Sequence, residues 1–354
     1  IEDAQGDVLG MIESAALSGL EAHAKRAVDN NDFVVALPAA EREAGVIQVW
    51  LGQRADEQQD EQDAHEEQQK LFDTHAARVF LERGEQETHC GPLAAAETAL
   101  VEQVDGEKIA SVGIALPSPV DIKLGHAKHL TAFQEKDLPV RDMLKERTGV
   151  DIKLGNDVNM ATLAEYKFGA GKGVSSLFTF YPGTGLGGGY IYKGKLVTGF
   201  NSTAAEVGHV VIDIDGPLCK CGRHGCLETI VSYHGLKTML GEKLAAGAVC
   251  HIDPSSFRAT DIIDAWRKGD PVLSELLEYQ ARALGIGIAN VINITGVERI
   301  ILGGTIYHEL QDDLLPIIEK NAVKYAIGNG MDGVDIFLNE LGDEAPALGA
   351  SMLD

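Results

Sequence analysis

Three cysteines and one histidine are the residues of this chain whose types and spacing most clearly predict chemistry. Cys219, Cys221 and Cys226 fall within eight positions, and His209 precedes the first of them by ten. Three thiolates and one imidazole form a closed tetrahedral ligand set, which is typical of structural rather than catalytic zinc. The alternative is a free-thiol loop or a disulfide, but a Cys219–Cys221 bond is strained and one of three cysteines stays unpaired. The spacing therefore predicts a Zn2+ site at these four residues.

The cluster lies inside a longer pattern, Glu206-Val-Gly-His209 followed by Cys219-Lys-Cys-Gly-Arg-His-Gly-Cys-Leu-Glu228. This pattern resembles the signature of the ROK family of sugar kinases and sugar-responsive repressors, and the likeness runs from about residue 111 to the C-terminus. The resemblance implies an α/β protein with a two-lobed actin/hexokinase-like (ribonuclease H-like) fold, a ligand cleft between the lobes and a zinc loop. It also implies a homodimer or homotetramer.

Glu206, His209 and Glu228 bracket the predicted metal. Carboxylates and an imidazole can hold vicinal sugar hydroxyls through charge-assisted hydrogen bonds. The resemblance assigns the ring nitrogen of His209 that does not bind zinc to a sugar hydroxyl, so the metal fixes a residue of the sugar site. For either glutamate, the alternative is a plain surface charge.

Asn156 and Asp157 follow a predicted strand over residues 151–154. A carboxylate there can accept the proton of a sugar hydroxyl during phosphoryl transfer, or it can simply cap the next helix. In the resembling kinases this Asp is the general base and both residues contact the sugar, whereas repressors keep the Asp for sugar binding without catalysis. His129 stands where the kinases usually have a sugar-binding Asn and is a further candidate ligand.

Glycine-rich turns supply the candidate phosphate and nucleotide contacts. Gly183, Thr184 and Gly185 follow a predicted strand, where backbone N–H groups and a hydroxyl can cradle a phosphate. A plain hairpin turn is the alternative. In the resembling kinases this is a phosphate loop, and Gly303 and Gly304 resemble the segment that lies against adenosine.

Departures from the kinase pattern favour the repressor branch. ATP-using members place Asp-x-Gly-x-Thr between their first two strands, but residues 36–43 here contain no glycine and no threonine. Pro38 removes an N–H donor, and two glutamates repel phosphate. Some 32 residues precede the first predicted strand, and residues 14–25 resemble the end of a winged helix-turn-helix. An N-terminal helix packed on the first lobe is the alternative.

The sequence therefore favours a sugar-responsive transcriptional regulator of the ROK type. Such a protein binds a sugar or sugar phosphate in the cleft and contacts DNA through an N-terminal segment that we expect to be mostly absent from this chain. The alternative is an ATP-dependent sugar kinase that binds ATP and Mg2+ and uses Asp157 as general base.

Alternating strands and helices predict two α/β lobes behind an N-terminal extension. The extension covers residues 1–32, the first lobe residues 33–150, and the second, larger lobe residues 151–354. For the C-terminal helix, the sequence leaves open whether it packs on the second lobe or on the first. Within the first lobe, residues 44–50 are predicted as a strand and residues 65–83 as a helix.

Composition and charge restrict the partners. The 354 residues are 45% hydrophobic, yet no apolar run reaches the length of a membrane span, and we expect no signal peptide. We therefore expect a cytoplasmic protein without a membrane partner, and five cysteines suit that reducing compartment.

The net charge is −24, and residues 1–110 carry 24 acidic against 8 basic side chains, which repel DNA phosphates. The chain opens with Ile rather than Met, so we expect it to begin partway into the gene product.

Overall fold

The computed structural model describes residues 46–53, 76–80, 109–130, 135–253 and 257–353. It divides the chain into two compact units, each described by itself below. Unit 1 comprises Ile1–Ala161 and Glu344–Asp354, and unit 2 comprises Thr162–Asp343.

The boundary between the units falls later than the one expected at residues 150 and 151. The reason is β7 (Asp151–Asn156), which pairs in parallel with β3 (Ile109–Leu116) and so belongs to the sheet of unit 1. The C-terminal segment Glu344–Asp354 also belongs to unit 1.

Unit 1 contains a four-stranded sheet of order β2-β1-β3-β7. The two remaining strands are β1 (Val46–Gln53) and β2 (Ala76–Phe80), and β1 is antiparallel to both β2 and β3. The helix predicted over residues 65–83 is therefore wrong at Ala76–Phe80, because the ladder with β1 satisfies that backbone as a strand. The N-terminal extension and the 36–43 segment lie outside the described residues.

The other elements of unit 1 are short. A three-stranded antiparallel sheet is formed by β4 (Val120–Asp121), β5 (His126–Leu130) and β6 (Glu135–Leu138). Helix α4 (Val140–Thr148) follows, and α5 (Asp157–Phe168) begins directly after β7.

Helix α12 (Ala345–Ala350) contacts β1, β2, β3 and β7 of the four-stranded sheet. Glycines permit this packing, because a Cβ at Gly349 would collide with the carbonyl oxygen of Met160, and one at Gly113 with that of Ala350.

Unit 2 is built on a five-stranded sheet of order β10-β9-β8-β11-β12. Its strands are β8 (Ser176–Pro182), β9 (Leu186–Tyr192), β10 (Lys195–Leu196), β11 (Arg299–Leu302) and β12 (Asp335–Leu338). β8, β9 and β10 run antiparallel, whereas β8, β11 and β12 are parallel. The carboxyl ends of β8 and β11 therefore meet at one edge of the sheet.

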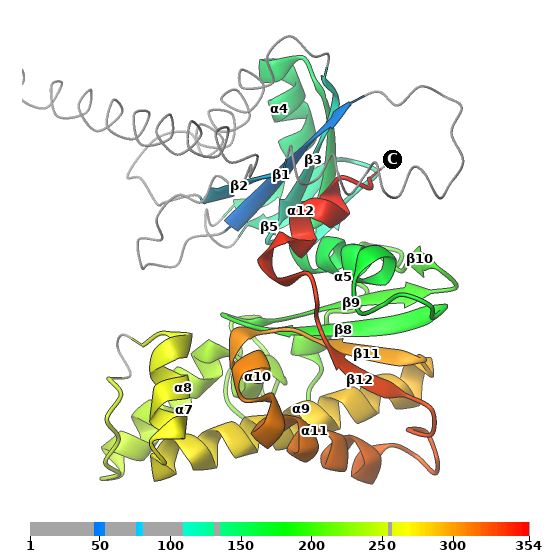
Figure 1. Ribbon diagram of the computed structural model, residues 1–354. Helices are drawn as coiled ribbons and strands as arrows, with labels where there is room; N and C mark the ends of the chain where they lie inside the picture. The colour runs from blue at the N-terminus through cyan, green and yellow to red at the C-terminus, as the bar shows by residue number, and fades with distance from the viewer. Residues whose placement is uncertain (1–45, 54–75, 81–108, 131–134, 254–256, 354) are drawn as a thin grey trace, which may run out of the picture. The chain divides into compact units, whose positions relative to one another are not determined.

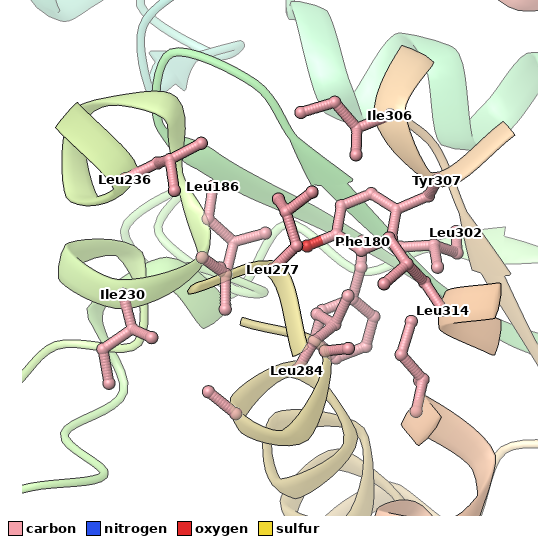
Figure 2. Close-up of a cluster of buried hydrophobic side chains, with 14 of the residues drawn as sticks. Phe180, Leu186, Ile230, Leu236, Leu277, Leu284, Leu302, Ile306, Tyr307 and Leu314 are labelled. Atoms are coloured by element: carbon pink, nitrogen blue, oxygen red, sulfur yellow. The ribbon is translucent and has the colours of Figure 1, made fainter. Parts of the chain in front are cut away.

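Helices cover one face of this sheet and enclose the main core (Figures 1 and 2). They are α6 (Glu228–Val231), α7 (Tyr233–Ala245), α8 (Ala259–Arg267), α9 (Pro271–Thr295), α10 (Thr305–Glu309) and α11 (Gln311–Tyr325). Figure 2 shows Phe180, Leu277 and Leu284 among the buried side chains of this core. The opposite face of the sheet packs on α5, where Thr162 and Thr179 share a 2.5 Å hydrogen bond between their hydroxyls.

The length of α9 is explained by its ends. Asp270 caps the N-terminus by accepting N–H bonds from Val272 and Leu273, and Pro271 occupies the first turn, where no N–H donor is needed. Gly296 closes the helix in the left-handed conformation at φ 59°. Within the described ranges, no helix combines the length and apolar character needed to cross a membrane.

Candidate functional site

The four predicted metal ligands converge in unit 2. The ligand atoms of His209, Cys219, Cys221 and Cys226 all lie within 4.8 Å of one another. Cys219 Sγ is 3.7 Å from His209 Nδ1, and the sulfurs of Cys221 and Cys226 are 3.6 Å apart. Two sulfurs bound to one tetrahedral zinc at about 2.3 Å stand roughly 3.8 Å apart. The residues therefore fit a tetrahedral ion with sulfur and nitrogen ligands.

A short hairpin brings the first and last ligands together. The 3-10 turn η1 (Val207–His209) ends in His209, and isolated bridges pair Val211 with Cys226 and Leu218 with His224. The N–H of Leu227 also bonds to the carbonyl of Val210 at 2.9 Å. These bonds hold Cys226 beside the turn that carries His209.

A tight turn then directs Cys219 and Cys221 to the same point. The N–H of Gly222 bonds to Cys219 O at 2.9 Å, and the N–H of Cys219 bonds to Arg223 O at 2.8 Å. Gly225 has φ +70°, and a Cβ there would collide with the carbonyl of Asp213. Only glycine fits this position, which lies immediately before Cys226.

The thiols do not ionise alike. Burial acts to raise the pKa of Cys221, but hydrogen bonds with Arg223 and with the thiols of Cys219 and Cys226 outweigh it and lower that pKa to about 6. Burial, together with hydrogen bonds to the other thiols, raises the pKa of Cys226 to about 12. The neighbouring groups thus stabilise the thiolate of Cys221, whereas the thiol of Cys226 becomes harder to ionise. Full ionisation of all three at neutral pH requires a cation among them.

Two carboxylates flank the cluster. Glu228 places Oε1 3.8 Å from Cys219 Sγ, while its Oε2 accepts the N–H of Leu186 at 2.9 Å. Burial of its carboxyl raises the pKa of Glu206, although the residue as a whole is exposed; His209 opposes this shift and Glu228 adds to it. Glu206, His209 and Glu228 are therefore close enough for their charges to interact. Because Nδ1 of His209 faces the cluster, Nε2 is the ring nitrogen left for another partner.

The two glycine segments meet at the carboxyl edge of β8 and β11. Residues 183–185 join Pro182 of β8 to Leu186 of β9, so the loop is shorter than the glycine-rich run 183–189. The N–H of Gly303 bonds to Phe180 O at 2.8 Å, and a Cβ at Gly304 would lie 2.7 Å from Pro182 O. The structure thus brings together the segments that the sequence assigned to phosphate and to adenosine.

Asn156 and Asp157 lie in unit 1, at the junction of β7 and α5. Asp157 Oδ1 accepts hydrogen bonds from Asn156 Nδ2 at 2.9 Å and from the N–H of Val158 at 2.8 Å. Asn156 Nδ2 also donates to Ser118 O, and its Oδ1 accepts the N–H of Asn159. The amide of Asn156 therefore orients the carboxylate of Asp157. The side chain of His129 lies outside the described residues.

Two functional contacts were missed by sequence reasoning. Arg223 lowers the pKa of Cys221, and its place between two cysteines was a readable signal, because a cation favours thiolates. Leu186 supplies the backbone N–H that engages Glu228, and nothing in the sequence separates it from its neighbours.

The ROK family model matches residues 79–354. The chain belongs to the ROK family. ROK relatives include both enzymes and regulators. A glucokinase of Thermotoga maritima is 34% identical over 73% of this chain and 83% of its own. The N-acetylglucosamine repressor of Escherichia coli O157:H7 is 30% identical over 70% of this chain, which spans only 60% of the repressor.

Solved ROK structures show the same two branches. A ROK family transcriptional regulator, a homologue of the E. coli Mlc protein, matches with a TM-score of 0.70 at 25% identity, over 78% of this chain and 70% of that one. A ROK family glucokinase from Streptomyces griseus, solved with glucose and AMPPNP, matches with a TM-score of 0.66 at 28% identity, over 77% and 90%. These matches confirm the predicted α/β, actin/hexokinase-like fold class, and they fit the regulator and the kinase equally.

Proposed function

We propose that this ROK protein binds a sugar or sugar phosphate and acts as a sugar-responsive transcriptional regulator. The observation that carries sugar binding is the group formed by Glu206, His209 and Glu228 around the cysteine cluster of unit 2. Two carboxylates and one imidazole nitrogen offer acceptors for adjacent hydroxyls, and hydrogen bonds to charged groups are the strong ones. Zn2+ is the ion we assign to the cluster, where its positive charge stabilises the thiolates.

The ligand class follows from the relatives. One neighbouring structure was solved with glucose, and several relatives are N-acetylglucosamine repressors. Glucose and N-acetylglucosamine, free or phosphorylated, are therefore the ligands we propose first. Asp157, oriented by Asn156 within unit 1, stays a proposed sugar ligand, as the family resemblance implies.

The regulator is preferred over the kinase because residues 36–43 lack the glycine and threonine with which ATP-using members hold phosphate. Pro38 within this segment offers no N–H, and Glu41 and Glu43 carry the wrong charge for a phosphate site. DNA binding by the N-terminal segment remains a prediction from the resemblance.

An ATP-dependent sugar kinase is the second candidate, and the meeting of residues 183–185 with Gly303 and Gly304 favours it. In that case the glycine loops hold the nucleotide, Mg2+ neutralises its phosphates, and Asp157 accepts the proton of the attacking hydroxyl. Asn156 keeps the carboxylate aimed by the 2.9 Å bond to Oδ1.

One experiment separates the two candidates. Calorimetric titration of the zinc-loaded protein with glucose and N-acetylglucosamine, each free and phosphorylated, is expected to show binding to one of these ligands. The substitution Glu206→Gln should weaken that binding roughly 10- to 100-fold, the cost of one charged hydrogen bond. Glu319→Gln, at an exposed position on α11, is the matched control and should leave affinity unchanged.

The same preparation is then assayed with MgATP and the sugar that binds. A regulator shows no turnover. Phosphorylation at about 1 s⁻¹ or faster, abolished by Asp157→Asn, replaces the regulator with the kinase. Failure of every sugar to bind, with full metal content, defeats both candidates.

A further inference from the structure

Leu186, the first residue of β9, contacts both ends of residues 208–228, the segment that carries the four predicted metal ligands. Its N–H donates to Glu228 Oε2 at 2.9 Å. On the other side, Gly208 lies so close to the carbonyl oxygen of Leu186 that a Cβ there would collide with it. Leu186 follows the 183–185 loop directly. Its N–H contacts Glu228 and its carbonyl contacts Gly208, the two ends of the segment 208–228.

The metal ligands join these two ends. Gly208 adjoins His209, and Glu228 follows Cys226 by two positions. The ligand atoms of His209 and Cys226 belong to the cluster within 4.8 Å, and Glu228 Oε1 is itself 3.8 Å from Cys219 Sγ. An ion bound there cross-links both contacts to Leu186.

The same segment also touches the loop itself. The N–H of Tyr233, just beyond the helix that Glu228 begins, bonds to Gly183 O at 2.8 Å. At the other end of the loop, a Cβ at Gly185 would lie only 2.6 Å from Glu228 Oε2. Residues 228–233 therefore contact the first and last residues of the 183–185 loop.

We propose that Glu228 is a positioning residue through which the bound metal holds the 183–185 loop in its phosphate-binding conformation. Metal occupancy then controls whether a phosphoryl group, of a sugar phosphate or of a nucleotide, can bind this edge of the sheet. That ligand class rests on the proposed function, whereas the link from metal to loop does not.

Amide hydrogen exchange of the full chain, resolved at Leu186 and Tyr233, tests the link without any ligand. In the zinc-loaded protein both amides should be protected. Removal of zinc with a chelator should raise both exchange rates at least tenfold, while the amides of β11, between β8 and β12, stay protected. Those β11 amides report whether the unit remains folded.

Two variants separate Glu228 from a general effect of the metal. Glu228→Ala should keep its zinc, measured by elemental analysis, yet raise exchange of Leu186 about tenfold, because an amide without its acceptor opens freely. Glu228→Gln retains an oxygen acceptor and should restore most of the protection. Glu242→Ala, at an exposed position on α7, is the matched control and should change neither rate.

The proposal is overturned if chelation leaves Leu186 and Tyr233 within twofold of their zinc-loaded rates. It is equally overturned if Glu228→Ala, with zinc retained, leaves Leu186 protected. If Glu228→Ala also loses protection in β11, the variant is unfolded, and the chelation experiment, which needs no substitution, decides the proposal. A protein that meets the exchange predictions but binds no sugar refutes the proposed function and leaves this link intact.

Discussion

At Gly225 the backbone has φ +70° and faces the carbonyl of Asp213 without room for a side chain. Gly222, three residues earlier, has φ +87°, but a Cβ there meets nothing within 4 Å. An alanine at Gly222 would therefore suffer backbone strain alone, whereas an alanine at Gly225 would suffer both strain and a collision.

Gly225→Ala should lose metal, because relief of the collision must displace the residue next to Cys226. We expect at least a tenfold loss of zinc affinity, in the range caused by disturbing groups that support metal ligands. Gly222→Ala should bind zinc nearly as the parent does and cost only roughly 1–2 kcal/mol of strain. Zinc competition with a colorimetric chelator, with thermal unfolding alongside, measures both effects. Equal zinc affinities in the two variants would contradict this account.

At this residue scale, the candidate metal cluster was predictable because cysteine and histidine spacing is local. The four ligands were named from spacing and residue type alone, and the structure brings them within 4.8 Å. The contact between Glu228 and Leu186 joins residues 42 positions apart, so it depends on how β9 and α6 come together. Sequence reasoning placed Glu228 beside a sugar but could not find its backbone partner.

At the scale of elements, the N-terminus of α9 depends on Asp270, a buried carboxylate that accepts two N–H bonds from the first turn of the helix. Burial acts to raise its pKa, but hydrogen bonds from the N–H of Leu273 and from Cys250 and His251 outweigh it and lower that pKa. A depressed folded pKa stabilises the fold above the ordinary value of 3.8, and this stabilisation is lost as the pH falls through the folded value.

Asp270→Ala should therefore destabilise unit 2 by about 1–2 kcal/mol at pH 7, the usual cost of a lost N-cap. Asp270→Asn keeps an acceptor oxygen and should cost less. The difference in stability between the parent protein and the Asp270→Asn variant should shrink as the pH falls from 3.8 through the lower folded pKa of Asp270, since the aspartate is neutralised first in the unfolded and then in the folded state. Urea unfolding at pH 7 and pH 3 measures this, with Asp264→Ala, exposed on α8, as control. A difference that does not change with pH would exclude the charge as its cause.

The elements themselves were predictable where local signals agree. The end caps of α9, Asp270 and Gly296, are residue types that mark helix ends in a sequence. The error at Ala76–Phe80, within the helix predicted over residues 65–83, has the opposite origin. A polar, glutamine-rich run favours helix locally, yet Ala76–Phe80 pairs with β1, and tertiary pairing overrides local propensity.

At the scale of the whole molecule, the chain passes between its two units twice, within α5 and near residue 343. On the side of unit 2, the buried carboxylate of Glu165 accepts N–H bonds from Ala170, Glu340 and Leu341. On the side of unit 1, Gly349 packs on the backbone of Met160. On either side of the crossings, these contacts join residues of the same unit. We therefore expect each unit to be stabilised by its own contacts.

This division predicts where loss of metal acts. All four ligands lie in unit 2, and a ligand at 1,000 times its dissociation constant stabilises a fold by about 4 kcal/mol. Chelation, or Cys221→Ser, should therefore lower the unfolding temperature of unit 2 and weaken sugar binding with it, since His209 is proposed to bind both the metal and the sugar. Hydrogen exchange in β3 and β7 should stay within about twofold of the zinc-loaded protein, because a bound ion shifts only the equilibrium of the part that binds it. A single calorimetric transition that shifts as a whole, with β3 and β7 losing protection alongside the zinc loop, would show instead that the two units unfold as one.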